Sequence, residues 1–442
     1  MGKYRRLFND TLIYGLGNFL SKLIMVLLIP LYTKELNAAQ FAYVDLLTNL
    51  LELLYPILTF SIADAVFRYI IDKEKDTITI FINGFYVLLF GNFLLVPTLF
   101  IINYFYPLEN FLVLILLFLS NSLKSFFSQF TRGIGKSSLF ALTGILNALF
   151  LLIFNFILLS HFHLGVLGYL ISIVFSNLIA TLILFYKANI YVYFRKIIFR
   201  TTVIFDMLKY SVPLIPNTLS WWFVNIFSRY VVMYFHGASI TGLLSAAARI
   251  AGIINLLSQI FQQAWQYSSA VEFSSDDRNI FFSNVFRYYS LLLIFFGSLA
   301  ISFSPLIVKY FLNTSYSRAI EFIPFLFLSA IIGAYCYFFS SLYMANMESK
   351  IIMHSTLIGA IINIVLTVIM VRTIAIGAVI SIFISNCVIL YIRVKRLNFI
   401  KINYNFSSWI SSLIVLTLQA ILWTKEEKNH LWSFVFIIVL GI

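Results

Sequence analysis

Long apolar runs separated by short polar segments dominate the 442-residue chain. Most runs have about 20 residues or more, enough for an α-helix to cross a hydrocarbon core of ~30 Å at 1.5 Å per residue. The predicted spans are Thr11–Tyr32, Phe41–Ala63, Ile78–Asn103, Phe111–Phe127, Leu139–Ser160, Gly165–Tyr186, Tyr210–Phe235, Ile240–Tyr267, Phe281–Ser304, Glu321–Ala345, Ile352–Val371 and Ile374–Ile392. Two shorter runs, Ser407–Trp423 and Leu431–Ile442, follow them. We therefore expect an all-α polytopic membrane protein with twelve transmembrane helices, or thirteen or fourteen if the last runs also cross.

Polar residues recur on one face of each of the first two predicted helices. Tyr14, Asn18 and Lys22 are spaced i, i+4, i+8, and Asp45, Asn49 and Glu52 are spaced i, i+4, i+7. An ionised side chain at membrane depth costs several kcal/mol unless it faces protein or water. These faces therefore predict an interior cavity.

Composition and charge support this class of protein. Hydrophobic residues make up 61% of the chain and charged residues 11%, against roughly 25% charged residues in soluble domains. With the N-terminus in the cytoplasm, the loops on that side carry 21 Lys and Arg residues, counting Lys124 and Arg393, and the opposite loops carry 6. Three more, Lys22, Arg229 and Arg249, lie within spans. This asymmetry predicts a cytoplasmic N-terminus and explains the net charge of +13 without a nucleic-acid partner.

The two halves of the chain look duplicated. At an offset of 200 residues, Asn37-Ala38 and Gly237-Ala238 each fall in the turn between the first two helices of a half. Later in each half, a helix with a central asparagine (Asn147 or Asn363) follows a polar loop. We expect two pseudo-symmetric six-helix bundles in the same orientation around a central cavity, with the substrate site near the midplane. The expected divisions are an N-terminal lobe (1–195), a basic cytoplasmic linker (196–209), a C-terminal lobe (210–400) and one or two further segments (401–442).

The chain offers little for catalysis or metal binding. Cys336 and Cys387 sit in apolar runs and are expected to be buried, and the histidines are scattered. No nucleophile–base pair or phosphate-cradling glycine loop is present, and no outward loop is long enough to carry a catalytic domain. We expect no enzyme activity, no metal site and no cofactor.

One stretch, LIYGLGNFLSKLIMVLLIPLYTKELNAAQFAYVDLLTNLLELLYPILTFSIADAVFRY, resembles the start of polysaccharide (O-antigen type) flippases of the multidrug/oligosaccharidyl-lipid/polysaccharide exporter superfamily. The similarity extends more weakly through RGIGKSSLFALTGILNALF and YSVPLIPNTLSWWFVNIFSRYVV. The first turn departs from the usual glycine-rich form, because it reads Leu36-Asn37-Ala38-Ala39. The resemblance implies a flippase that moves undecaprenyl-pyrophosphate-linked oligosaccharides across the bacterial inner membrane by alternating access. It also implies that a polysaccharide polymerase and chain-length proteins are partners, beside the lipid-linked substrate and membrane lipids.

Such a substrate needs fixed positive charge for its phosphates and polar or aromatic groups for its sugars. We expect Lys22, Arg229 and Arg249 to face the pyrophosphate, because Arg offers phosphate a planar set of donors and Lys a point charge. Each cation has a structural alternative, which is pairing with Asp45 or Glu52 or snorkelling to the interface. The expected cavity and sugar-facing residues are Asn18, Asn49, Asn217, Trp221, Asn225, Gln259 and Gln263, with Trp265 as a further aromatic contact.

Asp45 and Glu52 have a second interpretation, as sites that couple transport to H⁺ or Na⁺. The alternative functions are a multidrug or cation exporter of the same superfamily and an integral-membrane glycan polymerase. A cation exporter needs acidic rather than basic cavity residues, so Arg229 and Arg249 argue against it.

Overall fold

The computed structural model describes residues 21–425, except 22, 73–75, 196–197, 274, 347 and 401–405. This described part is helical and contains no strand, which confirms the predicted all-α class. Ten stretches within it are long and apolar enough to span a membrane. One of these, Thr201–Gln259, has 59 residues and covers two predicted spans that meet at Gly237, where φ is 80°. Counting it twice, and adding the first helix, which is described as helical over 23–35, gives the expected twelve.

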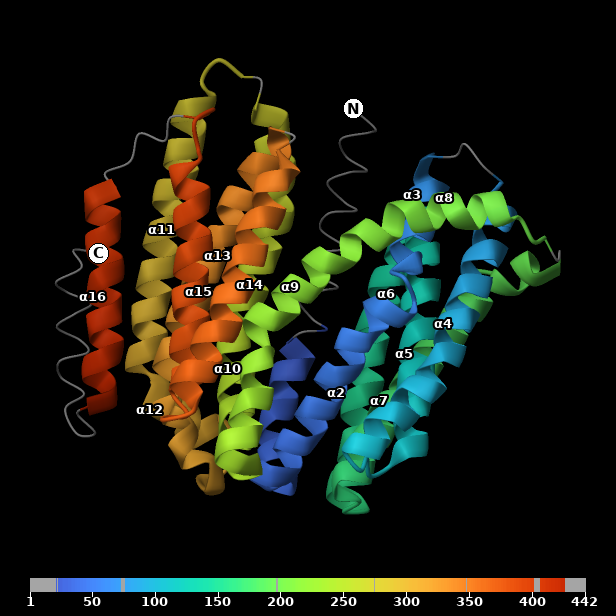
Figure 1. The fold of residues 1–442 in the computed structure, drawn as a ribbon, viewed down its shortest axis with the longest axis horizontal. Helices are drawn as coiled ribbons and strands as arrows, with labels where there is room; N and C mark the ends of the chain where they lie inside the picture. Colours follow the sequence, from blue (N-terminus) through green and yellow to red (C-terminus); the bar gives the residue numbers. More distant parts are fainter. Residues whose placement is uncertain are drawn as a thin grey trace. The chain divides into compact units, whose positions relative to one another are not determined.

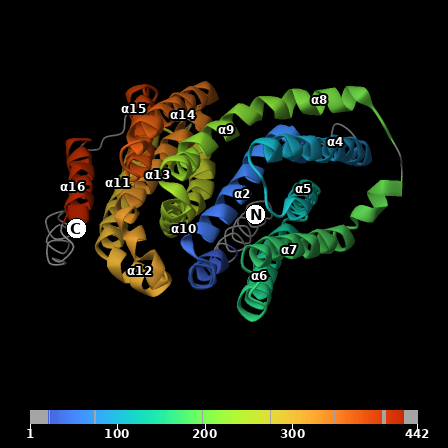
Figure 2. The ribbon, with the colours of Figure 1, turned by 60° about the horizontal axis from the view of Figure 1, so that its bottom comes forward.

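The described chain divides into two compact units, residues 1–31 with 43–219 and residues 32–42 with 220–442. The first contains α2 (Ala38–Leu58, from Tyr43 on), α3 (Ile62–Asp72), α4 (Thr77–Phe105), α5 (Phe111–Gly133), α6 (Ser137–Asn155), α7 (Gly165–Lys187) and α8 (Thr201–Ser211), with short turns η1 (Phe156–His161) and η2 (Ile190–Arg195). Helix α5 lies at its centre and packs on α3, α4, α6 and α7. Figure 2 shows α5 between α4 and α7.

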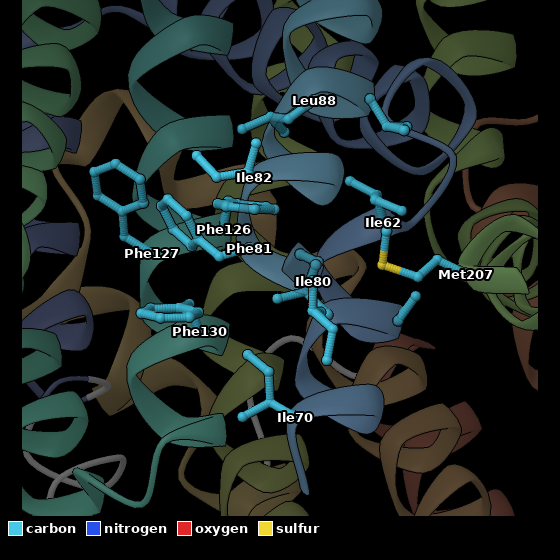
Figure 3. Packing of buried hydrophobic residues seen from close by; sticks show 14 of the residues in the cluster. Ile62, Ile70, Ile80, Phe81, Ile82, Leu88, Phe126, Phe127, Phe130 and Met207 are labelled. Carbon is cyan, nitrogen blue, oxygen red and sulfur yellow. The ribbon is translucent and has the colours of Figure 1, made fainter. Parts of the chain in front are cut away.

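An aromatic cluster forms the core at one end of this unit. Phe81 of α4 lies 5.6 Å from Phe126 and 4.6 Å from Phe130 of α5, measured between ring centroids. Met207 of α8 packs against the same cluster, and Ile62 of α3 belongs to it as well (Figure 3). Burying several Phe side chains, at roughly 1.5–3 kcal/mol each, fixes α8 on the ends of α3 and α4.

The second unit is built around α13 (Ile323–Ala345). Its other helices are α10 (Phe227–Glu272), α11 (Arg278–Ser302), α12 (Ser304–Phe311), α14 (Ser349–Val371), α15 (Gly377–Lys395) and α16 (Phe406–Lys425), with the short turn η4 (Thr314–Glu321). Helix α13 is buried along nearly its whole length by α10, α11, α14, α15 and α16 (Figure 1). The chain passes from one unit to the other within α9 (Ile215–Asn225), after the short turn η3 (Val212–Leu214).

The duplication is visible in both units. Helices α5, α6 and α7 begin 212 residues before α13, α14 and α15, since the paired starts are 111 and 323, 137 and 349, 165 and 377. The packing repeats too, because α7 contacts α5 and α6 as α15 contacts α13 and α14. The predicted turn pair also recurs: the first helix ends before Asn37, and α10 is interrupted at Gly237. These matches support the expected internal repeat.

Two details differ from the expectations. The expected linker 196–209 contains most of α8, which belongs to the first unit. Lys124 and Arg393, assigned above to loops, lie inside α5 and α15. The run Leu431–Ile442 lies outside the described residues.

Candidate functional site

The predicted acidic face of α2 is divided in the structure. Asp45 and Asn49 are buried at 4% and 8% exposure, and the Asn49 amide donates a hydrogen bond of 3.2 Å to the Asp45 carboxylate. Glu52, one turn further along, is exposed. Asn18 and Lys22 lie outside the described residues, so their predicted roles stay predictions.

Arg249 is the predicted cation whose surroundings are best defined. Its guanidinium carbon lies 4.8 Å from the ring centroid of Phe41 and 5.4 Å from that of Tyr32, within cation–π range. Both rings are buried, and Phe41 makes an edge contact with Tyr316 of η4 at 6.1 Å. An aromatic wall from residues 32–42 and η4 therefore lies beside the Arg249 side chain.

A glycine on α10 makes this wall possible. The Cβ of any other residue at 242 would collide with the backbone carbonyl of Ala38, so the start of α2 packs directly on α10 there. Asn37 caps that start: its side chain accepts from the Gln40 amide at 2.9 Å, and Gln40 reciprocates at 3.1 Å. The Tyr316 hydroxyl donates to the Leu36 carbonyl at 2.8 Å and fixes the same turn to η4.

The remaining predicted residues of α9 and α10 do not form one cluster in the described contacts. Trp221 stacks on Tyr337 of α13 at 5.3 Å, and the Asn225 amide donates to the Trp221 carbonyl at 2.9 Å. Arg229 is half-buried in the first turn of α10. Asn217 and Gln259 are also half-buried, and the side chain of Gln263 lies outside the described part.

The prediction that Trp265 contacts sugar is wrong for this conformation. Its side chain is 3% exposed, its indole N–H donates to the Phe338 carbonyl at 3.2 Å, and its ring stacks on Phe338 at 4.7 Å. Trp265 therefore packs the interface between α10 and α13.

A buried amine that the sequence analysis assigned to a loop lies in the first unit. Lys124, at the fourteenth position of the 23-residue α5, donates from Nζ to Asn177 Oδ1 of α7 at 2.8 Å. Asn147 of α6 donates to the same oxygen at 3.3 Å. Within the described part of the chain, no carboxylate pairs with Lys124. The ammonium group on α5 is therefore held by one neutral amide oxygen on α7, which also accepts from an amide on α6.

A second such cation lies in the second unit. Arg393 of α15 is fully buried, and all five guanidinium N–H groups are used. They donate to the Ser355 hydroxyl (3.0 Å), the Cys336 carbonyl (2.7 Å), the Ser340 hydroxyl (2.7 Å), the Ile352 carbonyl (3.4 Å) and the Thr356 hydroxyl (2.9 Å). Because these partners come from α13 and α14, Arg393 ties three helices together. It has no spare donor for a ligand.

The sequence carries a signal for both residues. Lys124 falls inside the predicted span Phe111–Phe127, and Arg393 directly follows the span that ends at Ile392. A cation near a span end is usually an interface residue, and only the packing of neighbouring helices shows that these two are internal.

Among the described residues, no group of three or more His, Cys, Asp or Glu side chains has the arrangement of a metal site. Beside the Asp45 carboxylate, the groups described above are guanidinium and ammonium cations, carboxamides and aromatic rings. Such groups bind anions and hydroxylated rings.

Comparisons with known proteins give both a family and a fold. The profile of a family described as "Polysaccharide biosynthesis protein" matches residues 7–266, more than half of the chain. No curated protein matches the chain significantly.

Several solved transporter structures match the chain. The inward-facing conformation of a multidrug resistance transporter of the multidrug/oligosaccharidyl-lipid/polysaccharide superfamily is 13% identical, with a TM-score of 0.69 over 86% of this chain and 94% of that chain. The outward-facing conformation of such a transporter gives 13% identity and a TM-score of 0.61, over 94% of this chain and 96% of that one. A superfamily transporter from Pyrococcus furiosus, described as having a binding pocket of reverse polarity that suggests a different function, is 12% identical with a TM-score of 0.62, over 88% and 95%. At this identity the likeness establishes the transporter fold.

Proposed function

Because the chain belongs to the polysaccharide biosynthesis protein family, we propose that it is a flippase for lipid-pyrophosphate-linked oligosaccharides. It would carry repeat units for O-antigen or another surface polysaccharide from the cytoplasmic to the outer leaflet of the bacterial inner membrane. A polysaccharide polymerase and chain-length proteins would act on the product. The transporter fold supports alternating access as the mechanism.

The observation that carries the substrate class is the position of Arg249 in α10. It places a permanently charged guanidinium in a membrane helix beside the rings of Tyr32 and Phe41. A guanidinium can make two parallel hydrogen bonds to phosphate oxygens, and flanking rings present a flat surface on which a sugar can stack. Lys124 and Arg229 supply further positive charge within spans, and the sequence places Lys22 in the first predicted span.

The second candidate is a multidrug or cation exporter, favoured by the similarity of the fold to a multidrug resistance transporter. Intramembrane cations repel a cationic drug, so they favour the anionic substrate instead. Asp45 has a separate role in this proposal: it is the carboxylate placed for coupling to H⁺ or Na⁺, since Asn49 holds one oxygen and Glu52 is exposed. We propose no enzymatic step.

The test replaces Arg249 in a deletion strain that makes the lipid-linked glycan. A charged group on phosphate contributes roughly 1.5–3 kcal/mol, so Arg249→Ala should lower export about tenfold to a hundredfold while its membrane level stays normal. Arg249→Lys should retain part of the activity, because it keeps the charge but loses the planar donors. The matched control is Arg318→Ala, since Arg318 is exposed and pairs with Glu321 across one turn.

The readouts are accumulated precursor in the inner leaflet and glycan at the cell surface. Normal export by Arg249→Ala would end the role of Arg249. Normal glycan in the deletion strain itself, together with transport of a cationic dye by vesicles holding the protein, would replace the flippase proposal with the exporter.

A further inference from the structure

Helix α8 runs across the first unit, whereas the spanning helices run along it. Figure 1 shows α8 lying across the ends of α3 and α4, which it contacts, and Figure 2 shows it beside α4. Its start is anchored, because the buried Asn83 side chain accepts from the Arg200 backbone amide at 2.8 Å. Its middle is anchored as well, since the Tyr69 hydroxyl donates to the Asp206 carbonyl at 3.0 Å. The helix is therefore a fixed part of the unit.

The inner face of α8 is apolar, and its outer face combines exposed aromatic and basic side chains. Val203 and Met207, four residues apart, are buried in the core cluster. On the outer face, Phe205 is 75% exposed, and Phe199 just before the helix is 65% exposed. Lys209 follows Phe205 by one turn on this outer face and is also exposed.

Positive charge surrounds the exposed rings. Between residues 187 and 211 the sequence has five basic residues, Lys187, Arg195, Lys196, Arg200 and Lys209, against a single acidic one, Asp206. Arg195, Arg200 and Lys209 are exposed. The same end of the unit carries Lys136, whose Nζ binds the last carbonyls of α7. The loop 106–110 joins α4 to α5 and the loop 162–164 joins η1 to α7, both at the opposite end of the unit. Neither loop contains Lys or Arg.

We propose that α8, together with Phe199 and Arg200 just before it and Arg195 at the end of η2, forms a binding surface for anionic lipid headgroups in the membrane interface. If α8 lay in water, two large aromatic rings would be exposed to solvent. If it lay in the hydrocarbon core, several cations would lose their hydration. The interface satisfies both, because rings such as Phe205 insert at the acyl boundary while Lys and Arg contact lipid phosphates. The surface fits an anionic lipid better than a zwitterionic one, since each basic residue near the surface favours it by about fivefold. This inference does not depend on the transported substrate.

The experiment places a fluorophore on the outer face of α8 in the full-length protein. A Phe205→Cys variant, in a Cys387→Ala background that leaves only the fully buried Cys336, is labelled with bimane and reconstituted in nanodiscs. Phosphatidylcholine discs receive the same fraction of either brominated phosphatidylglycerol or brominated phosphatidylcholine. We expect both brominated lipids to quench the label. Half-maximal quenching should need a fraction of brominated phosphatidylglycerol at least tenfold lower than the fraction of brominated phosphatidylcholine. A label at Phe93→Cys, which is exposed within the span α4, should be quenched equally by the two.

Charge removal then tests the headgroup contact. Arg195→Gln/Arg200→Gln/Lys209→Gln should abolish the preference for phosphatidylglycerol and leave quenching by phosphatidylcholine. The control Lys309→Gln/Arg318→Gln/Arg372→Gln removes the same charge from exposed positions elsewhere and should keep the preference. If neither lipid quenched the label at position 205, the proposal would be overturned, because that result means that the outer face of α8 contacts water or a protein partner instead of lipid. Equal loss of preference in both triple variants would also overturn it, because net charge alone would then explain the effect.

Discussion

Replacing Arg393 tests whether a fully buried guanidinium holds the second unit together. Methionine has a similar length and no charge, so Arg393→Met removes five hydrogen bonds to α13 and α14 with little change in volume. The hydroxyl partners are not left orphaned, because Ser340 still donates to the Cys336 carbonyl at 2.8 Å and Thr356 to the Ile352 carbonyl at 2.8 Å. The loss is therefore that of the arginine bonds themselves.

Hydrogen bonds between membrane helices average ~0.6 kcal/mol, so five of them come to about 3 kcal/mol of unfolding free energy. The desolvation of the guanidinium opposes this, but it is limited here because every N–H has an acceptor. Arg393→Lys, with three donors for five acceptors, should lose about half as much. We expect clear destabilisation in the order Met, Lys, wild type.

The assay is thermal unfolding in detergent, followed by a thiol-reactive dye. In the Cys387→Ala background the remaining thiol is that of Cys336, which is fully buried and whose own carbonyl accepts from Arg393, so the dye reports on the affected helices directly. Arg318→Met, the same change at an exposed site, should leave the unfolding midpoint unchanged. If Arg393→Met unfolded at the temperature of the wild type, desolvation would equal the hydrogen-bond gain and the proposed tie between the helices would be refuted.

Two further predictions concern the first unit. Lys124→Met should lower glycan export at least tenfold while the protein stays at its normal level in the membrane, because the charged amine has donors left for an anion beyond its bond to Asn177. The measurement is the accumulation of lipid-linked precursor, and full export by the variant would contradict the prediction. Burial raises the pKa of Asp64, at the end of the second predicted span, although Arg132 opposes the shift. The folded state then binds a proton more readily than the unfolded chain, so stability should increase as pH falls from 7 through the raised pKa, by less than about 1 kcal/mol because the carboxylate is partly exposed. The Asp64→Asn variant should lack this increment in the same dye assay, and an equal pH response in both proteins would show that other groups cause it.

The sequence predicted the spans well because hydropathy over 20 residues is dominated by the bilayer rather than by neighbouring helices. The turn at Asn37 was predictable for a local reason too, since Asn37 and Gln40 cap each other across three residues. The position of Gly237 was recognised through the repeat, and its positive φ explains why a glycine is present there.

The site was predicted less completely, because side-chain surroundings depend on which helices pack together. Periodicity placed Asp45 and Asn49 on one face, and their contact confirms that pairing. It placed Glu52 there too, yet packing leaves this residue exposed. Trp265 shows the opposite error, since its spacing suggested a cavity while α13 covers it. A 100° step per residue fixes direction around one helix axis, but it cannot identify the neighbour in that direction.

Lys124 and Arg393 show how far a charge count can be trusted. Moving these two residues from the loops into the spans lowers the number of basic residues in the loops expected on the cytoplasmic side from 21 to 19, against 6 in the opposite loops, so the count still predicts a cytoplasmic N-terminus. The count tolerates such errors because orientation depends on a sum, whereas function depends on individual positions. Lys124 and Arg393 also occupy related places in the internal repeat. At the offset of 212 residues between α5 and α13, Lys124 corresponds to Cys336, and the Cys336 carbonyl accepts from Arg393. Each half thus has a cation at the junction of its three last helices, saturated by hydrogen bonds in the second half and held by a single amide oxygen in the first. This difference makes Lys124, rather than Arg393, the one of the pair that is suited to bind an anion.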